Sequence, residues 1–352
     1  MKNRTLLNVG FQVGALVVSL VVTTLLLVAA GAPPLDAYAS ILKGAFGTSR
    51  NLMVVLITWS PLLLTTAGVL ITFAAGLWNI GVEGQMVLGA IFATWGLRLL
   101  QDSTLPPALI IVVAILFGVV GGALWAGLAG VLKTFGGVNE IFGGLGLDFV
   151  ATALTIYLVF GPWKRPGVGS MSGTQPFPER LWLPTLPGTG LSPWGLGLAL
   201  LAVVIVYLLL RGTYLGLKLK AVGHNTRAAF LLGVPTWQYS MFSFLLSGAI
   251  TGLAGAIQVA AVYHRLLPNI SNGYGWLGLL VAMLINYQAV WVIPVAFFFA
   301  AINAGSVQLQ ILYKLDSSFG GVLQDLLVLF VLLGQGVRER VMSRAWEQDN
   351  AG

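Results

Sequence analysis

Long apolar runs, separated by short polar, glycine- or proline-containing stretches, dominate the pattern of the sequence. Residues 51–82 contain no charged side chain, and neither do residues 84–97 or 266–313. A transmembrane helix needs about 20 consecutive apolar residues, whereas a membrane barrel would show short segments of alternating hydrophobicity. The pattern therefore predicts an all-α, polytopic membrane protein.

The charge-free run 266–313 matters most for the number of spans. One helix of that length would extend about 72 Å at about 1.5 Å per residue, which is more than twice the core of a bilayer. The polar triplet at 286–288 (NYQ), with Pro294 beyond it, predicts a tight turn inside the run. We therefore predict about ten transmembrane helices, with nine or eleven as alternatives. The expected spans are 7–30, 52–74, 78–100, 107–131, 139–160, 193–210, 238–261, 268–286, 289–312 and 319–337.

Composition agrees with a membrane protein and narrows its class. The 352 residues are 57% hydrophobic and 8% charged, whereas soluble domains are about 25% charged, so we expect residues 1–352 to form a single transmembrane domain. The chain has no cysteine and two histidines, which excludes disulfides and thiolate metal sites and leaves no metal site to expect. The net charge of +7 is spread over many short loops, which is typical of contact with lipid headgroups rather than nucleic acid.

The distribution of basic residues predicts the orientation. Ten spans place both termini on one side, and with cytoplasmic termini ten of the 18 Lys and Arg residues lie inside, including the dense cluster at 211–227. Because positive loops favour the cytoplasmic side, we expect both termini there. The apolar run after MKNRTLL is too long for the apolar region of a signal peptide and lacks a clear cleavage site, so we expect a retained first span.

Two loops stand out between the spans. The external loop 161–193 is rich in Pro, Gly and Ser and is either an ordered cap or a flexible loop. The cytoplasmic loop 211–235 is basic, and Asn225 or Thr226 is expected to cap a short helix that runs to Leu232 and is stopped by Gly233 and Pro235. Such a helix is either a docking element for a partner groove or a connector lying on anionic lipid.

The sequence lacks the signals of a catalytic site but places carboxylates at membrane depth. It has no phosphate-binding loop, no H-E-x-x-H and no nucleophile elbow, so no catalytic residue is predicted. Glu140 follows Asn139 at the start of a span, as a helix cap followed by a first-turn acid does. Glu83 and Asp148 lie deepest in the predicted spans. A charge there needs a partner, a water-filled cavity or a function, and an ion-coupled carrier would use such groups.

Four stretches of the sequence, spread over residues 60–300, resemble motifs of one family. GLWNIGVEGQMVLGA resembles the F-N-I-G-x-E-G-Q signature of ABC-transporter permeases for nucleosides and simple sugars, and GGVNEIFGGLGLDFVA resembles the V-N-E segment of that family. LKAVGHNTRAAFLLGVPTWQYSMFSFLLSGAITGLAGAI is similar to its cytoplasmic loop and the helix that follows, and GYGWLGLLVAML is similar to its G-Y-G segment. The family is related to the branched-chain amino acid and ribose permeases.

The resemblance implies a permease subunit of an ATP-driven importer that moves a nucleoside or related ribose-containing solute by alternating access. It implies a second permease subunit, expected to be a different chain, two ABC ATPase domains and an extracytoplasmic solute-binding protein, in the inner membrane of a bacterium or archaeon. No cofactor is expected, since partner subunits would use the ATP. The residues expected to couple to the ATPase are Gly223, His224, Asn225, Arg227 and Gly233. The residues expected along the substrate pathway are Asn79, Glu83, Gln85, Asn139, Asp148 and Asn286.

The sequence departs from the family pattern at three positions and leaves several alternatives open. Trp78 stands where Phe is usual, Asp148 where Asn is common, and Asp325 follows Gln324 where Gly is expected. A simple-sugar permease and an ion-coupled carrier remain the rival functions. Glu83 either contacts solute or is a structural carboxylate that holds a neighbouring helix through exposed backbone amides at a break.

Overall fold

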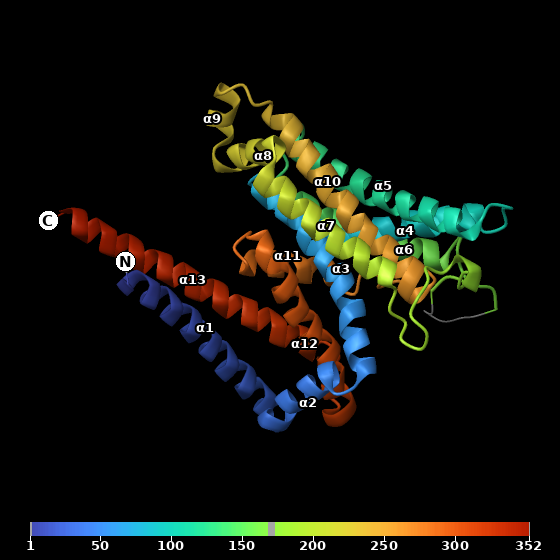
Figure 1. Cartoon of the computed structure of the whole chain (residues 1–352), viewed down its shortest axis with the longest axis horizontal. Coiled ribbons are helices and arrows are strands. Elements are labelled where there is room, and N and C mark those ends of the chain that lie inside the picture. The colour runs from blue at the N-terminus through green and yellow to red at the C-terminus, as the bar shows by residue number, and fades with distance from the viewer. Residues whose placement is uncertain (1, 168–172, 352) are drawn as a thin grey trace. The chain divides into compact units, whose positions relative to one another are not determined.

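The computed structural model describes residues 2–167 and 173–351, and the regular structure within these ranges is helical (Figure 1). The chain divides into two compact units. The smaller consists of Met1–Val55 and Phe298–Gly352, and the larger of Leu56–Phe297.

The larger unit carries most of the helices. It contains α4 (Val82–Leu100), α5 (Pro107–Thr134), α6 (Glu140–Phe160), α7 (Pro193–Gly212), α8 (Tyr214–His224), α9 (Thr226–Leu231), α10 (Thr236–Ile257) and α11 (Tyr274–Leu284), with most of α3 (Ser49–Ala74) and the start of α12 (Val292–Tyr313). A π-helical turn, Gln258–Tyr263, extends α10, and short 3-10 turns lie at Glu179–Leu181 and Ala289–Trp291.

Glycine lets three helices of the larger unit approach closely. Helices α4, α5 and α10 run side by side in Figure 1. A Cβ added at Gly89, Gly122 or Gly252 would collide with the backbone of a neighbouring helix. Small residues allow such packing between membrane helices. Buried apolar side chains, among them Leu88 and Ile110, pack around this contact.

Short polar side chains begin several of the helices. Ser192 accepts a hydrogen bond from the N–H of Gly195 at the start of α7, and Thr213 accepts one from Gly216 at the start of α8. Each hydroxyl satisfies one of the N–H groups that a helix start leaves without a partner inside the helix.

The smaller unit pairs the two ends of the chain. It contains α1 (Lys2–Ala29), α2 (Pro34–Phe46), α13 (Phe319–Ala351) and most of α12. Helices α1 and α13 pack together, and α1 and α2 are bent by 104° at their junction. Leu27, Ile41 and Leu309 belong to its apolar core.

The predicted all-helical class is confirmed, but the count of about ten spans is not. In the described part of the chain, seven helices are long and apolar enough to cross a membrane, or up to eight if the bent pair α1–α2 is one span. The segment expected at 268–286 contains only the 11-residue helix α11, and α4 carries both Glu83 and Arg98 within its 19 residues. The turn predicted at 286–288 is present between α11 and α12, with Asn286 and Tyr287 at positive φ.

The described second half of the loop 161–193 is folded onto the end of α10. Leu183 donates a backbone hydrogen bond to Ala260, and Phe177 donates one to His264. The ring of Trp182 stacks on His264, with centroids 3.7 Å apart. These contacts hold residues 177–183 against this end of the helix, and residues 168–172 of the predicted loop lie outside the described ranges.

Candidate functional site

Glu83 caps a helix that belongs to a distant segment of the sequence. The chain leaves the π-helical turn after Tyr263 and becomes helical again only at α11, whose own N-cap, Gly273, offers no side chain. The Glu83 carboxylate accepts hydrogen bonds from the backbone N–H groups of Gly273 (3.1 Å), Gly275 (2.7 Å) and Trp276 (3.3 Å). These groups have no partner within their own helix, and a negative charge there also complements the helix dipole.

The sequence at the start of α11 fits this close approach. A Cβ at Gly275 would lie 2.6 Å from the Cα of Glu83, so a side chain at this position would push α4 and α11 apart. On the other side, the Thr65 hydroxyl of α3 donates to the carbonyl of Tyr274 at 3.0 Å. The first turn of α11 is therefore held between α3 and α4.

Asp148 caps the start of α4, as Glu83 caps the start of α11. Its Oδ1 atom accepts a hydrogen bond of 2.7 Å from the N–H of Gly84, in the first turn of α4, whose N-cap Gly81 has no side chain to offer. Both carboxylates are almost fully buried, Glu83 being 8% and Asp148 5% exposed. Asp148 on α6 thus caps α4, and Glu83 on α4 caps α11.

The second oxygen of Asp148 differs from the first. Its Oδ2 atom is buried without a hydrogen-bond partner in the described structure, and so is the indole Nε1 of Trp125. A Cβ added at Gly84 would lie 2.7 Å from Asp148 Oδ1 and 2.9 Å from Trp125 Nε1. Because Gly84 has no side chain, both polar groups can lie against the start of α4.

A buried amide pair completes the site. Gln85 donates to Asn79 at 2.7 Å, and Asn79 donates back to Gln85 at 3.1 Å and to the Ser247 hydroxyl of α10 at 2.9 Å. Buried amides are costly unless they are paired in this way. The pair fixes the turn before α4 against α10.

The structure thus brings together four of the six residues expected along the substrate pathway and leaves two apart. Asn79, Glu83, Gln85 and Asp148 surround the start of α4. Asn139 instead caps α6 by accepting from the N–H of Ile141 at 2.9 Å, as its position before Glu140 indicated. Asn286 is exposed in the turn after α11.

Several residues of this site carry too little sequence signal to be identified in advance. Thr65, Ser247 and Trp125 each lie in an apolar run. A single polar atom there changes neither the charge of the segment nor its hydrophobic period. The G-Y-G segment at 273–275 was the available signal. Its glycines mark a start of α11 that has no side-chain cap of its own and lies against another backbone.

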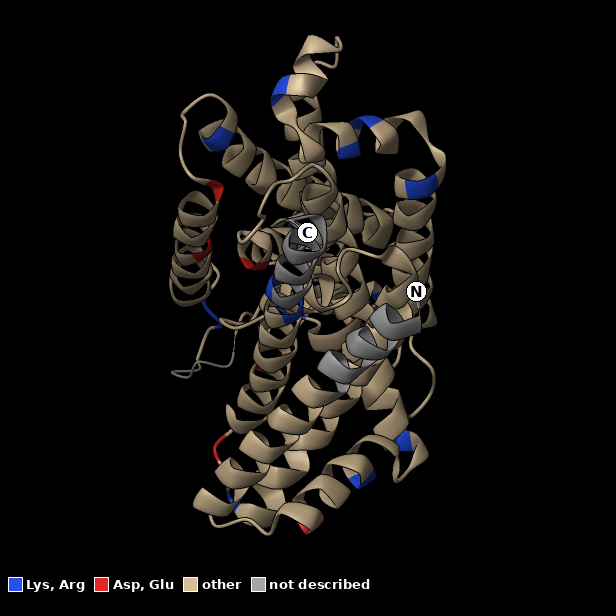
Figure 2. Cartoon of the chain, turned by 90° about the vertical axis from the view of Figure 1, so that its left-hand side faces the viewer, with Lys and Arg blue, Asp and Glu red and all other residues tan. Residues whose placement is uncertain are grey.

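The loop 211–235 forms two short helices, α8 and α9. Asn225 accepts a hydrogen bond of 2.9 Å from the N–H of Ala228 and caps α9, and Gly233 has a φ of +81° after its end. The short capped helix predicted from the sequence is confirmed. Figure 2 shows basic but no acidic residues along these two helices. The segment of the chain between Glu179 and Asp316 contains no acidic residue at all.

The end of α8 touches the turn that leads to α4. Gly76 has a φ of +72°, and a Cβ added there would lie 2.9 Å from both the Cα and the carbonyl oxygen of Gly223. A Cβ at Gly223 would in turn collide with the carbonyl of Ala74. His224, Asn225 and Arg227 are exposed beyond this contact. The backbone of the basic loop is therefore packed directly on the turn that precedes Asn79 and Glu83.

An apolar surface projects from α9. Phe230, Leu231 and Leu232 are 67%, 78% and 83% exposed. Three consecutive large apolar side chains that stay uncovered are typical of an interaction surface.

Comparison with known proteins places this arrangement among transport systems. A family model described as the permease component of the branched-chain amino acid transport system matches residues 51–334. The glucose ABC transporter permease protein TsgB13 of Haloferax volcanii is 32% identical over 336 residues, which cover 93% of this chain and 87% of that protein. The guanosine ABC transporter permease protein NupP of Bacillus subtilis is 27% identical, over 92% of this chain and 93% of its own. The nucleoside ABC transporter permease protein NupB of Lactococcus lactis is 24% identical, over 84% and 81%.

Proposed function

The chain belongs to the family of branched-chain amino acid transport system permease components, and from this premise we propose that it imports a nucleoside or related ribose-containing solute by alternating access. The resemblance seen in the sequence motifs is thereby confirmed at the level of the family. ATP would be hydrolysed on two separate ABC ATPase domains. A second permease subunit and an extracytoplasmic binding protein would complete the importer, in a cell or inner membrane with both termini of this chain in the cytoplasm.

A contact route through the larger unit carries the proposal. Gly223 at the end of α8 packs on Gly76, and the turn that follows holds Asn79 and leads into Glu83, which holds the start of α11. A displacement of α8 would therefore move the start of α4 and, with it, the cap of α11. Polar groups at broken helices line the sites of many transporters, so this is where a change in the loop would reach the solute path.

The surface of α9 supports ATPase docking at the loop. Its capped helix presents Phe230, Leu231 and Leu232 to the outside, and an apolar helix face suits a groove on a partner. We assign coupling to this helix, which carries Arg227, and to the adjoining Gly223.

The nature of the solute is supported by the relatives and by one sequence segment. NupP and NupB are named for guanosine and nucleoside transport, whereas the glucose permease TsgB13 is more similar in sequence. We favour a nucleoside because NupP and NupB are named for such solutes and the V-N-E segment resembles the larger permease of a nucleoside-type pair, and we keep a simple sugar as the second candidate. Both carry a sugar ring with several hydroxyl groups, so weak permease contacts would suit either.

Uptake by the assembled transporter tests the function. ATP-dependent uptake of labelled guanosine should be competed by unlabelled nucleosides and not by glucose. ATP-dependent uptake of labelled glucose that unlabelled sugars compete and nucleosides do not would establish the sugar alternative. Uptake by this chain alone under a proton gradient, without ATPase subunits, would establish the ion-coupled rival instead.

A double variant tests the docking assignment separately. Phe230→Ser with Leu231→Ser should lower ATP-dependent uptake by about tenfold or more, because buried apolar anchors dominate interfaces, while the amount of protein in the membrane stays unchanged. Leu186→Ser, an exposed leucine of the loop 161–193, is the matched control. Normal uptake by the double variant would refute the assignment.

A further inference from the structure

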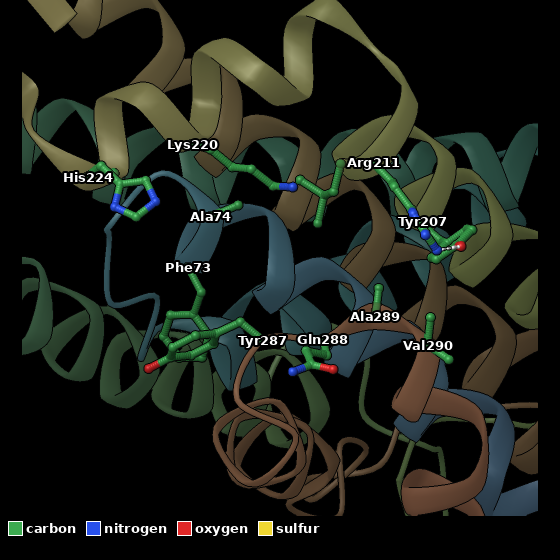
Figure 3. Close-up of a pocket in the computed structure, with 12 residues that line it drawn as sticks. Phe73, Ala74, Tyr207, Arg211, Lys220, His224, Tyr287, Gln288, Ala289 and Val290 are labelled. Carbon is green, nitrogen blue, oxygen red and sulfur yellow. Dashed lines mark hydrogen bonds between the residues drawn. The ribbon is translucent and has the colours of Figure 1, made fainter. Parts of the chain in front are cut away.

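A cavity lies between the end of α7, helix α8 and the turn before α12. Its volume is about 520 Å³ (Figure 3). Arg211, Lys220 and His224 lie along one side of it, and Phe73, Tyr287 and Gln288 lie across from them. All of these residues belong to the larger unit. We propose that this cavity binds the headgroup of an anionic phospholipid.

The charge of the cavity calls for an anion. Its lining contains Arg211, Lys220 and His224 and no acidic residue. Arg211 donates a hydrogen bond to the hydroxyl of Tyr207 and lies 5.6 Å from the centre of that ring, and both residues line the cavity. Within the described part of the chain, Lys220 forms no ion pair. A phosphate ester accepts hydrogen bonds from groups of this kind, and arginine and lysine are common phosphate ligands.

The apolar surroundings favour a lipid over a free phosphate. The cavity lies at the ends of two segments able to cross a membrane, Pro193–Gly212 and Ala289–Tyr313. Leu208 on the first segment and Val290 and Trp291 on the second are each about half exposed. A free anion would make no use of such a surface, whereas acyl chains would cover it while the phosphate reaches the cations. Tryptophan is also typical of the membrane–water interface, and basic pockets between membrane helices are known to bind anionic headgroups.

The site has a consequence for the loop, because Gly223 and Ala74 line the same cavity. Both belong to the contact between α8 and the turn before α4. A bound headgroup would bridge Lys220 on α8 and Arg211 on α7, and so stabilise the loop in the arrangement that the structure shows.

Lipid retention by the purified transporter tests the proposal. The full chain with its partner subunits is equilibrated with vesicles of phosphatidylcholine alone or with added phosphatidylglycerol, and the retained lipid is measured by native mass spectrometry. Phosphatidylglycerol should be retained over phosphatidylcholine. The Arg211→Gln, Lys220→Gln variant should lose about thirtyfold in apparent affinity, because each basic residue near the site adds about a factor of five.

Matched variants and a soluble competitor keep the result interpretable. Lys218→Gln removes a charge from the same helix as Lys220 but not from the cavity lining, and retention should change little. If the double cavity variant fails to fold, Lys220→Gln alone should still show a several-fold loss. Equal retention by cavity and control variants would overturn the proposal. Displacement of the lipid by inorganic phosphate at similar concentration would overturn the choice of a lipid.

Discussion

Removal of the Glu83 carboxylate should release the start of α11. Glu83→Ala would leave the N–H groups of Gly273, Gly275 and Trp276 buried or half-buried without their acceptor, since α11 has no cap of its own. Glu83→Gln keeps one carbonyl acceptor but turns an NH₂ group toward backbone donors. We therefore expect the order of stability to be Glu, then Gln, then Ala.

The size of the effect follows from the two shorter hydrogen bonds. A hydrogen bond to a charged group contributes about 1.5–3 kcal/mol, so the bonds of 2.7 and 3.1 Å are together worth roughly 3–6 kcal/mol on that basis. Burying a carboxylate offsets some of this gain, because its own hydration is lost. A net loss on the order of 2–4 kcal/mol for Glu83→Ala remains.

Thermal unfolding of the purified full-length chain in detergent measures the loss, and uptake by the assembled transporter measures its consequence. Glu179→Ala and Glu179→Gln, at an exposed glutamate of the loop 161–193, are the matched controls and should change neither. The cap predicts that stability and uptake fall together. If Glu83→Ala unfolded at the wild-type temperature while solute binding was lost, Glu83 would be a solute contact and the reasoning would be wrong.

Three further perturbations follow from the same structure. Asp148→Asn should keep the hydrogen bond from Gly84 and unfold near the wild-type temperature, whereas Asp148→Ala should lose about 1–3 kcal/mol; equal unfolding temperatures for the two variants would count against the cap. Gly223→Ala should reduce uptake more than it reduces the amount of protein in the membrane, because its Cβ collides with the Ala74 carbonyl, and full uptake would argue against the contact route. Burial lowers the pKa of His264 from its usual 6.5, so below that pH the unfolded chain binds more protons than the folded chain. Stability should therefore fall as the pH drops through and below 6.5. A His264→Gln variant should show a smaller fall, measured by the unfolding temperature on both sides of pH 6.5.

Local features of the fold could be predicted from the sequence because the signal and the structure lie close together. Asn225 caps α9 three residues before the N–H that it accepts, and Gly122 and Gly252 stand in small-residue stretches of the helices that they bring together. The turn at 286–288 is marked by its polar residues. In each case a few neighbouring residues determine the conformation, so a single sequence is sufficient.

The number of spans was harder to predict, since hydropathy measures only the apolar length of a segment. The run 266–313 around α11 is free of charge throughout, but its first stretch, from Leu266 to Gly273, is not helical. Near α1, hydropathy predicted one span and gave no indication of the 104° bend before α2. Backbone that leaves a helix in an apolar run needs hydrogen-bond partners from other segments, and the sequence does not say which segments are near.

The role of Glu83 shows where that limit lies. Its residue type and depth required a partner. The partner is a set of backbone amides about 190 residues away, and the sequence does not indicate which backbone amides are available as partners. The G-Y-G segment at 273–275 was the trace in the sequence, because the missing side chain of Gly275 makes room for Glu83. Asp148 follows the same logic at Gly84. In both places a carboxylate pairs with a glycine near a helix start that has no side-chain cap. Searching apolar sequences for acids together with uncapped glycine-rich helix starts is therefore a better guide to such sites than searching for pairs of opposite charge.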